Sequence, residues 1–169
     1  MFMEMTTELA EFYGALLGDG CLSVYPRKDR KNLGHCTLFT GHVHDRPYYE
    51  QTIRRICNKL FGIQGSIQKR KSYNCVIFVT TAKKVFDCLY LLGCPLGKKI
   101  DLTIPDIIFF DNDFAVHFVR GIFDTDGTVY NRYSKKYSNH SRLYSYKVVQ
   151  IKMKQPFLMS EFHHLYEWW

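Results

Sequence analysis

The chain has 169 residues, of which 46% are hydrophobic and 23% charged, and its formal net charge is +7. This length suits one domain, or two small related ones that share a core. No apolar run approaches the roughly 20 residues of a membrane span, and the acidic start MFMEMTTELAEFYG has the features of neither a signal peptide nor a transit peptide. The basic excess favours a polyanionic partner, chiefly nucleic acid. Because no apolar run is long enough to span a membrane, no membrane partner is expected.

The six cysteines are expected to be reduced and mostly buried thiols, with disulfides or zinc ligands as the alternative. They form no CxxC pair, and the chain is long for a disulfide scaffold and shows no secretion signal. We therefore expect an intracellular protein, cytoplasmic if its source is prokaryotic and otherwise organellar.

The first predicted element is a helix over residues 6–17, because its apolar residues recur at helical spacing. Thr6 or Thr7 can cap it, and it is expected to end at Gly18-Asp19-Gly20. The elements predicted to follow are strands at 21–25 and 34–44, a helix from Pro47 to about Leu60, strands near 63–70 and 73–80, and a helix at 82–92.

After Pro105 the order restarts. A helix from about 113 to 123 is predicted to end at Asp124-Thr125-Asp126-Gly127, followed by strands near 127–133 and 143–153 and by a helix that opens at Lys154-Gln155-Pro156. The segment FYGALLGDG at 12–20 aligns with VRGIFDTDG at 119–127, so the chain carries an internal repeat.

The repeat makes Asp19 equivalent to Asp126, and Gly14 equivalent to Gly121. A glycine inside a helix costs about 1 kcal/mol relative to alanine, and it is tolerated where another backbone approaches closely. Two helices packed along these glycines would bring the two acids together. Two carboxylates at helix C-termini repel each other, and divalent cations offset that repulsion. Metals between such acids can stabilise the oxygens of phosphodiester hydrolysis, so a basic chain of this kind is predicted to cut nucleic acid.

Both aligned segments resemble the LAGLIDADG motif of homing endonucleases, and GCPLGKKIDLTIPD at 93–106 is similar to the end of a first half-domain in that family. The resemblance covers most of the chain and is to single-chain, two-motif members from archaeal and organellar introns. It implies an α+β fold of two pseudo-symmetric αββαββα-type halves, the second shortened. Antiparallel saddle-shaped sheets would flank a central two-helix interface, and the halves would be residues 1–105 and 106–169.

The resemblance also implies an activity. The expected protein is a monomeric, site-specific double-strand DNA endonuclease of intron homing, which binds a long target site and leaves 3′ overhangs. It would use Mg²⁺ or Mn²⁺, whereas Ca²⁺ could bind without supporting cleavage. An RNA maturase of the same type, or a catalytically degenerate DNA-binding relative, is the alternative.

Site residues follow from the same resemblance. The implied metal ligands are the carboxylates of Asp19 and Asp126 and the carbonyls of Gly18 and Thr125. The implied catalytic residues are the two acids together with Lys98 or Lys99, His42, Gln150 and Lys152. His42 stands beside Gly41, at a position where the family often has a polar residue. The residues expected to contact DNA are Arg27, Lys28, Arg30, Lys31, Lys69, Arg70, Lys71, Arg132, Lys135, Lys136, Arg142, Lys147 and Lys154.

Other interpretations of these residues stay open. Asp-Gly is an ordinary turn pair, Lys98 and Lys99 could be a solvated pair, and His42 and His44 could bind a metal, although DNA contact or plain exposure is favoured. The segment FDTDGTV at 123–129 also resembles the first motif of haloacid-dehalogenase-type phosphatases, which requires a preceding strand. An EF-hand is excluded, because no glutamate closes the loop.

Overall fold

The structure is a computed structural model that describes residues 4–28, 31–70, 73–100, 102–135 and 143–151. In chain order its elements are α1 (Thr7–Asp19), β1 (Gly20–Pro26), β2 (Leu33–His42), the 3-10 turn η1 (Val43–Asp45), α2 (Arg46–Tyr48), the π-helical turn η2 (Tyr49–Ile53), α3 (Arg54–Phe61), β3 (Ser66–Arg70), β4 (Cys75–Thr80), α4 (Lys83–Leu91), the 3-10 turn η4 (Asp106–Ile108), α5 (Asn112–Asp126), β5 (Gly127–Lys135) and β6 (Leu143–Ile151).

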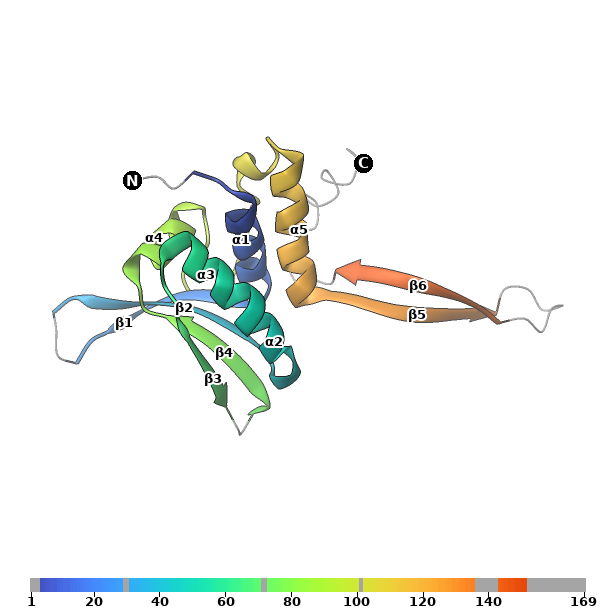
Figure 1. The fold of residues 1–169 in the computed structure, drawn as a ribbon, viewed down its shortest axis with the longest axis horizontal. Coiled ribbons are helices and arrows are strands. Elements are labelled where there is room, and N and C mark those ends of the chain that lie inside the picture. Colours follow the sequence, from blue (N-terminus) through green and yellow to red (C-terminus); the bar gives the residue numbers. More distant parts are fainter. Residues whose placement is uncertain (1–3, 29–30, 71–72, 101, 136–142, 152–169) are drawn as a thin grey trace.

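Helix α1 lies at the centre of the molecule. The Thr6 hydroxyl accepts a hydrogen bond from the Leu9 N–H at 3.1 Å, which satisfies one of the unpaired donors at the helix start. Every residue from Leu9 to Leu17 is buried. The helix is covered on more than one side, because the four-stranded sheet lies along one flank and α5 along another (Figure 1).

The first sheet is antiparallel and has the strand order β1-β2-β4-β3. Side chains alternate along β2, and Thr37 and Phe39 point into the core. The Phe39 ring lies 5.0 Å from Phe12 of α1 and 5.9 Å from Phe78 of β4, measured between centroids. Helices α3 and α4 cover the same face of the sheet (Figure 1). Helix α1 contacts both the sheet and α3, which together hold it in place.

Strand β2 ends at His42 rather than at residue 44 as predicted. The chain turns there because the Asp45 carboxylate accepts the His42 N–H at 3.0 Å and closes the 3-10 turn η1. This turn starts the continuous helical segment from Arg46 to Phe61 that the sequence predicts as one helix.

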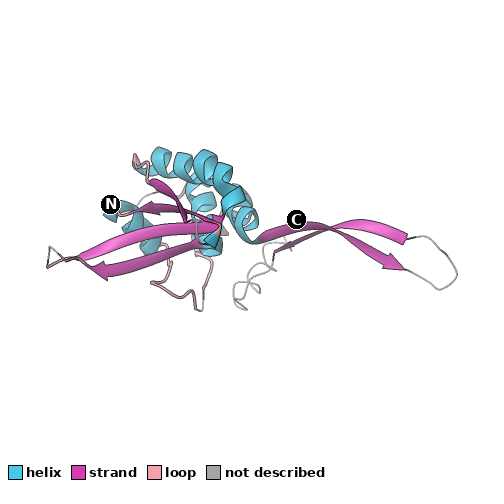
Figure 2. Cartoon of the chain, turned by 90° about the horizontal axis from the view of Figure 1, so that it is seen from below, coloured by secondary structure: helices cyan, strands magenta, loops and turns pink. Residues whose placement is uncertain are grey.

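The second copy of the motif begins with α5, which packs side by side with α1. Strands β5 and β6 form an antiparallel hairpin in which Gly127 pairs with Ile151, and it extends away from the helices in the direction opposite to the first sheet (Figure 2). The expected α+β class, with antiparallel sheets on either side of two central helices, is confirmed. The helix predicted from Lys154 lies outside the described residues, and the boundary between residues 105 and 106 stays a prediction.

The remaining expectations concern the cysteines and the membrane. All six thiols are free, but only Cys57 and Cys94 are buried and the other four are half-buried, so the prediction of mostly buried thiols is wrong. None of the helices in the described part of the chain combines the length and the hydrophobicity that a membrane crossing requires.

Candidate active site

Helices α1 and α5 touch through their backbones. A Cβ placed on Gly14 would overlap the Phe118 carbonyl oxygen, and a Cβ on Gly121 would overlap the carbonyl oxygen of Glu11. Any larger residue at either position would force the helices apart, which interiors at crystal-like packing density resist. The close approach predicted from the two helix glycines is therefore confirmed.

This contact brings the C-terminal ends of the two helices together. Asp19 and Asp126 are the last residues of α1 and α5, so each helix runs through its acid rather than stopping before it as predicted. A Cβ on Gly18 would lie 3.4 Å from Asp126 Oδ2 and would overlap the Thr125 hydroxyl. The carboxylate of one helix is thus in van der Waals range of the residue that precedes the other carboxylate.

The two acids share a partly dehydrated site. Burial, and then the charge of Asp126, raise the pKa of Asp19 from 3.8 to about 6. Burial also raises the pKa of Asp126, and the nearby charge of Lys99 acts in the opposite direction. Both shifts mean that the ionised carboxylates lack full compensation from the protein, and a bound divalent cation would supply it.

Lys99 reaches this site because the chain turns back after α4. The Gly97 N–H donates to the Leu22 carbonyl of β1 at 2.8 Å, and Gly97 has a φ of +74°, in the region that favours glycine. The Lys99 ammonium then donates to the carbonyl oxygens of Leu17 at 2.8 Å and Gly18 at 2.5 Å. It lies at the negative end of the α1 dipole, and burial lowers its pKa.

The structure distinguishes the two predicted lysines. Lys99 is partly buried against α1, whereas Lys98 is exposed. The backbone turn at Gly97 decides which of the two lysines contacts α1, and the sequence alone does not show this turn.

Sequence reasoning missed Tyr49. Its ring is buried at 1% exposure, and its hydroxyl donates to Asp19 Oδ2 at 3.2 Å. The residue belongs to the π-helical turn η2, and π turns often occur at functional sites. The one sequence signal for this contact is Gly41, because a residue without a side chain leaves room for the Tyr49 ring.

The other predicted catalytic residues are placed differently. His42 is exposed at the end of β2, where its Nδ1 accepts the His44 N–H at 3.4 Å and the two rings lie 4.8 Å apart. Gln150 pairs with Thr128 in the hairpin, just beyond α5, and its amide oxygen accepts the Tyr130 hydroxyl at 3.4 Å. Lys152 lies outside the described residues.

A metal site here would have few side-chain ligands. In the described part of the chain, no cluster of three or more His, Cys, Asp or Glu residues could hold a metal ion. The available donors are the two carboxylates and the backbone carbonyls, of which that of Gly18 already accepts Lys99. Mg²⁺ binds in proteins through one or two carboxylates and keeps several waters, so this oxygen-only donor set fits a hard divalent cation.

Asp124 does not fit the phosphatase interpretation. It lies within helix α5, whereas that motif needs a strand before its first aspartate. Its carboxylate is 3.8 Å from the Arg120 guanidinium, four residues earlier on the same helix.

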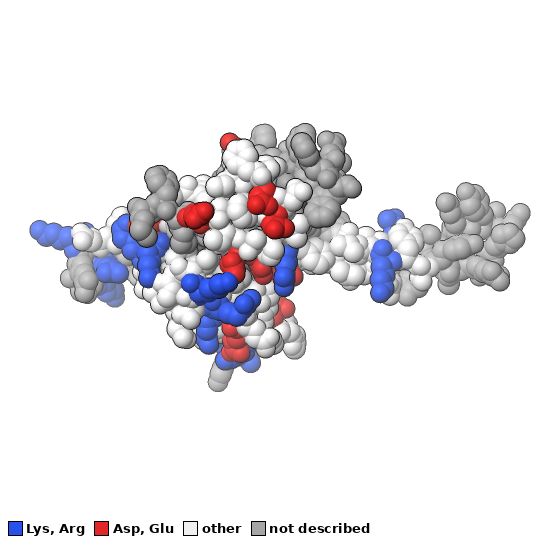
Figure 3. Space-filling model, turned by 45° about the horizontal axis from the view of Figure 1, so that its top comes forward, with Lys and Arg blue, Asp and Glu red and all other residues white. Residues whose placement is uncertain are grey.

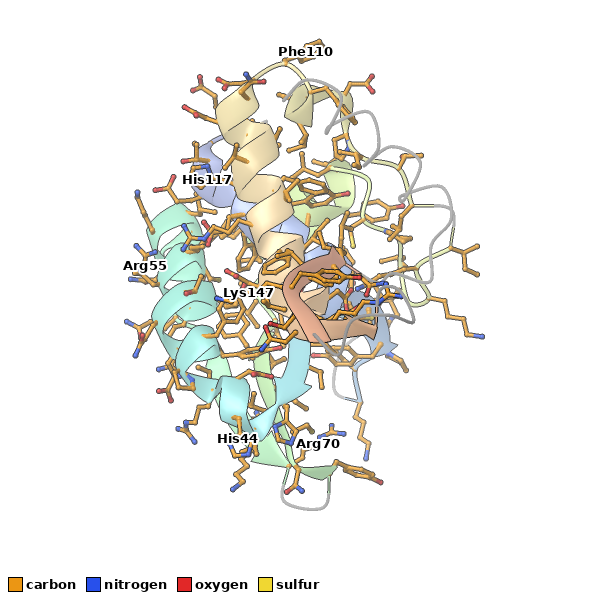
Figure 4. The ribbon with its side chains drawn as sticks, turned by 90° about the vertical axis from the view of Figure 1, so that its right-hand side faces the viewer. His44, Arg55, Arg70, Phe110, His117 and Lys147 are labelled. Atoms are coloured by element: carbon orange, nitrogen blue, oxygen red, sulfur yellow. The ribbon has the colours of Figure 1, made fainter. Side chains whose placement is uncertain are left out.

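The basic residues predicted to contact DNA are spread over the strands and their ends. Figure 3 shows Lys and Arg side chains at the outer end of β1 and β2 and, on the other side of the helices, over the hairpin. Figure 4 places Lys147 on that hairpin and Arg70 at the far end of β3. In the hairpin register, Lys147 pairs with Asn131 and Arg132 with Tyr146, so these two basic residues point to opposite faces.

Of the remaining predicted DNA contacts, Arg27, Lys28 and Lys31 flank the turn between β1 and β2, Lys69 precedes Arg70 in β3, and Lys135 is the last residue of β5. Those that lie outside the described residues are Arg30, Lys71, Lys136, Arg142 and Lys154.

Comparisons by sequence give no relative: no family model and no curated protein matches the chain. Solved structures do match. The homing endonuclease I-DmoI in complex with DNA and Ca aligns with a TM-score of 0.54 at 17% identity, over 72% of this chain and 58% of that one. The LAGLIDADG meganuclease I-AabMI bound to uncleaved DNA aligns with a TM-score of 0.53 at 13% identity, over 86% and 66%.

A third structure, the I-LtrWI LAGLIDADG homing endonuclease bound to target DNA, gives a TM-score of 0.52 at 9% identity, over 86% of this chain and 67% of that one. The chain spans about three fifths of the I-DmoI chain. At these identities the likeness concerns the fold alone. The chain has the fold of the LAGLIDADG homing endonucleases.

Proposed function

We propose that the chain is a site-specific, metal-dependent DNA endonuclease that hydrolyses phosphodiester bonds. The observation that carries this proposal is the pair of adjacent acids, Asp19 and Asp126, at the ends of two helices in backbone contact. Partly buried carboxylates with raised pKa values are unfavourable without a counter-charge, and they are typical of functional sites.

Asp19 and Asp126 would hold Mg²⁺ or Mn²⁺, with the carbonyls of Gly18 and Thr125 as further oxygen ligands. Such ions stabilise negative charge on the attacking and leaving oxygens of a phosphodiester. Lys99 adds a fixed positive charge beside the acids, and its hydrogen bonds to Leu17 and Gly18 hold that charge at the end of α1. A phosphate group is the substrate that two cations and an ammonium would together attract.

The distribution of basic residues supports a long duplex as the substrate. Basic side chains at the outer end of β1 and β2 and on the hairpin lie on opposite sides of helices α1 and α5 (Figures 1 and 3). A duplex bound at both ends would therefore pass these helices, whose last residues are Asp19 and Asp126. The structures of I-DmoI with DNA and Ca, and with DNA and Mn, hold the same kinds of ligand. Action as a monomer, a role in intron homing, 3′ overhangs and an intracellular location are part of the same proposal.

The test is cleavage of a plasmid that carries the intron-less allele of the host gene, in the presence of Mg²⁺. The wild-type protein is expected to linearise the plasmid, and Asp19→Asn combined with Asp126→Asn is expected to leave it intact. Lys98→Met serves as a control of unchanged activity, because that side chain is exposed, whereas Lys99 is partly buried against α1. Undiminished cleavage by the double variant, or no cleavage by the wild type, would refute the nuclease proposal.

A second measurement separates nuclease from binding module. With Ca²⁺ in place of Mg²⁺, the affinity for the target duplex should fall steeply between low and physiological salt, since each neutralised phosphate releases counterions. Salt-independent affinity would contradict the proposed arrangement of basic residues. Binding of intron RNA without any DNA cleavage would favour the maturase alternative.

A further inference from the structure

We propose that Tyr49 is the positioning residue for Asp19: its hydroxyl holds one carboxylate oxygen and leaves the other directed to the metal. The inference rests on the proposed function, because it requires that Asp19 binds a metal. It assigns a role in that binding to a side chain outside the motif.

Tyr49 is held by packing and by a hydrogen bond. Its ring is 1% exposed and packs edge-on against Tyr48, with centroids 5.9 Å apart. Most buried hydroxyls have a hydrogen-bond partner, and that of Tyr49 is Asp19 Oδ2 at 3.2 Å. The carboxylate is therefore held by a side chain that has little freedom of its own.

Gly41 makes room for this arrangement. A Cβ at Gly41 would lie 2.6 Å from the Tyr49 hydroxyl oxygen and 3.0 Å from the ring. Strand β2 thus contributes no side chain at the point where it passes the site, and the tyrosine from η2 occupies that volume. Gly41 and Tyr49 act together: the first is small so that the second can reach Asp19.

The neighbouring tyrosine provides a comparison. Tyr49 is the first residue of η2, and Tyr48 is the last residue of α2. The Tyr48 hydroxyl is also buried, yet it makes no hydrogen bond to another described residue. Of these two adjacent tyrosines, Tyr49 donates a hydrogen bond to Asp19 and Tyr48 does not, which makes Tyr48 a matched control.

The second copy of the motif does not repeat this feature in sequence. The alignment of Pro47 with Pro156 puts Leu158, which lies outside the described residues, opposite Tyr49. Leucine carries no hydroxyl, so the alignment gives Asp126 no sequence equivalent of Tyr49.

The test is the dissociation constant of Ca²⁺ and of Mn²⁺, each titrated alone at pH 8 into DNA-free protein by calorimetry. Tyr49→Phe keeps the ring and removes the hydroxyl, and loss of an outer-shell hydrogen bond should weaken metal binding about tenfold. Tyr48→Phe should stay within about twofold of the wild type, since its hydroxyl touches no ligand. Gly41→Ala should weaken metal binding as Tyr49→Phe does, because it displaces the hydroxyl.

Cleavage supplies a readout that a purely structural defect would not give. The cleavage rate of Tyr49→Phe should be low at limiting Mg²⁺ and should recover at saturating Mg²⁺. Its melting temperature in EDTA should show that the variant is folded. Equal metal affinity of Tyr49→Phe and the wild type, equal weakening by Tyr48→Phe, or no metal binding by the wild type would overturn the inference. A tenfold difference in affinity without any DNA cleavage would instead overturn the proposed function and leave the positioning role intact.

Discussion

Replacing Asp19 by asparagine should stabilise the metal-free protein. The pKa of this carboxyl is raised from 3.8 to about 6, first by burial and then by Asp126. The full shift corresponds to about 3 kcal/mol, and solvent screening of a partly exposed group reduces this to about 1–2 kcal/mol. Asparagine keeps the shape and an oxygen that can accept the Tyr49 hydroxyl, but removes the charge. For a chain of this size the melting temperature should rise by about 4 °C at pH 7.5.

The pH dependence gives this prediction its sign. The folded protein holds the Asp19 proton more tightly than the unfolded chain, so the contribution of Asp19 to stability is complete below pH 3.8 and is lost as the pH rises through about 6. The advantage of Asp19→Asn should therefore be absent near pH 3.5, grow between pH 4 and 6, and remain constant above pH 7.

The assay is urea denaturation from pH 3.5 to 8 in EDTA, followed by circular dichroism. The control is Asp87→Asn, which removes an exposed aspartate paired with Lys83 at 2.5 Å and should change stability by less than about 1 kcal/mol. Saturating Mg²⁺ should reverse the order, because the wild type binds the ion and gains stability from it. Unchanged or lower stability of Asp19→Asn in EDTA at pH 7.5 would refute the electrostatic argument.

Three further outcomes are expected. Lys99→Met should slow DNA cleavage by at least about a hundredfold, the lower end of the effect of a catalytic side chain, while Lys98→Met stays near the wild-type rate in the same plasmid assay. Gly121→Ala should lower the free energy of unfolding by about 2 kcal/mol, since its methyl group would overlap the Glu11 carbonyl; an unaltered urea midpoint would contradict the backbone contact. The affinity for Ca²⁺ in calorimetry should fall as the pH drops through about 6, where protons compete for Asp19, and a flat profile from pH 5 to 8 would count against that ligand.

Much of this site could be predicted from the sequence, because the repeat compares the chain with itself. Two glycines and two acids recur at matching positions, and only close helix packing accounts for the glycines. The sequence predicts both helix ends too early, because a glycine beside an acid suggests a stop. Both helices instead continue through their acids, Asp19 and Asp126.

What the sequence could not supply depends on backbone conformation. Strand β3 begins at Ser66 rather than near 63, because Gly62 and Gly65 have φ values of +64° and +60° and keep the chain out of the sheet. The contact between Tyr49 and Asp19 joins residues 30 positions apart through a π-helical turn, which no hydrophobic period reveals.

The backbone contact between α1 and α5 has a consequence for recombining halves of such proteins. Because Gly14 and Gly121 each meet a carbonyl oxygen of the opposite helix, the pairing depends on small residues at two positions rather than on matched side-chain shapes. A chimera would need to keep these glycines and the helix register, while the strands proposed to contact DNA could be exchanged. Modular retargeting of this scaffold would thus be limited by the spacing of two glycines.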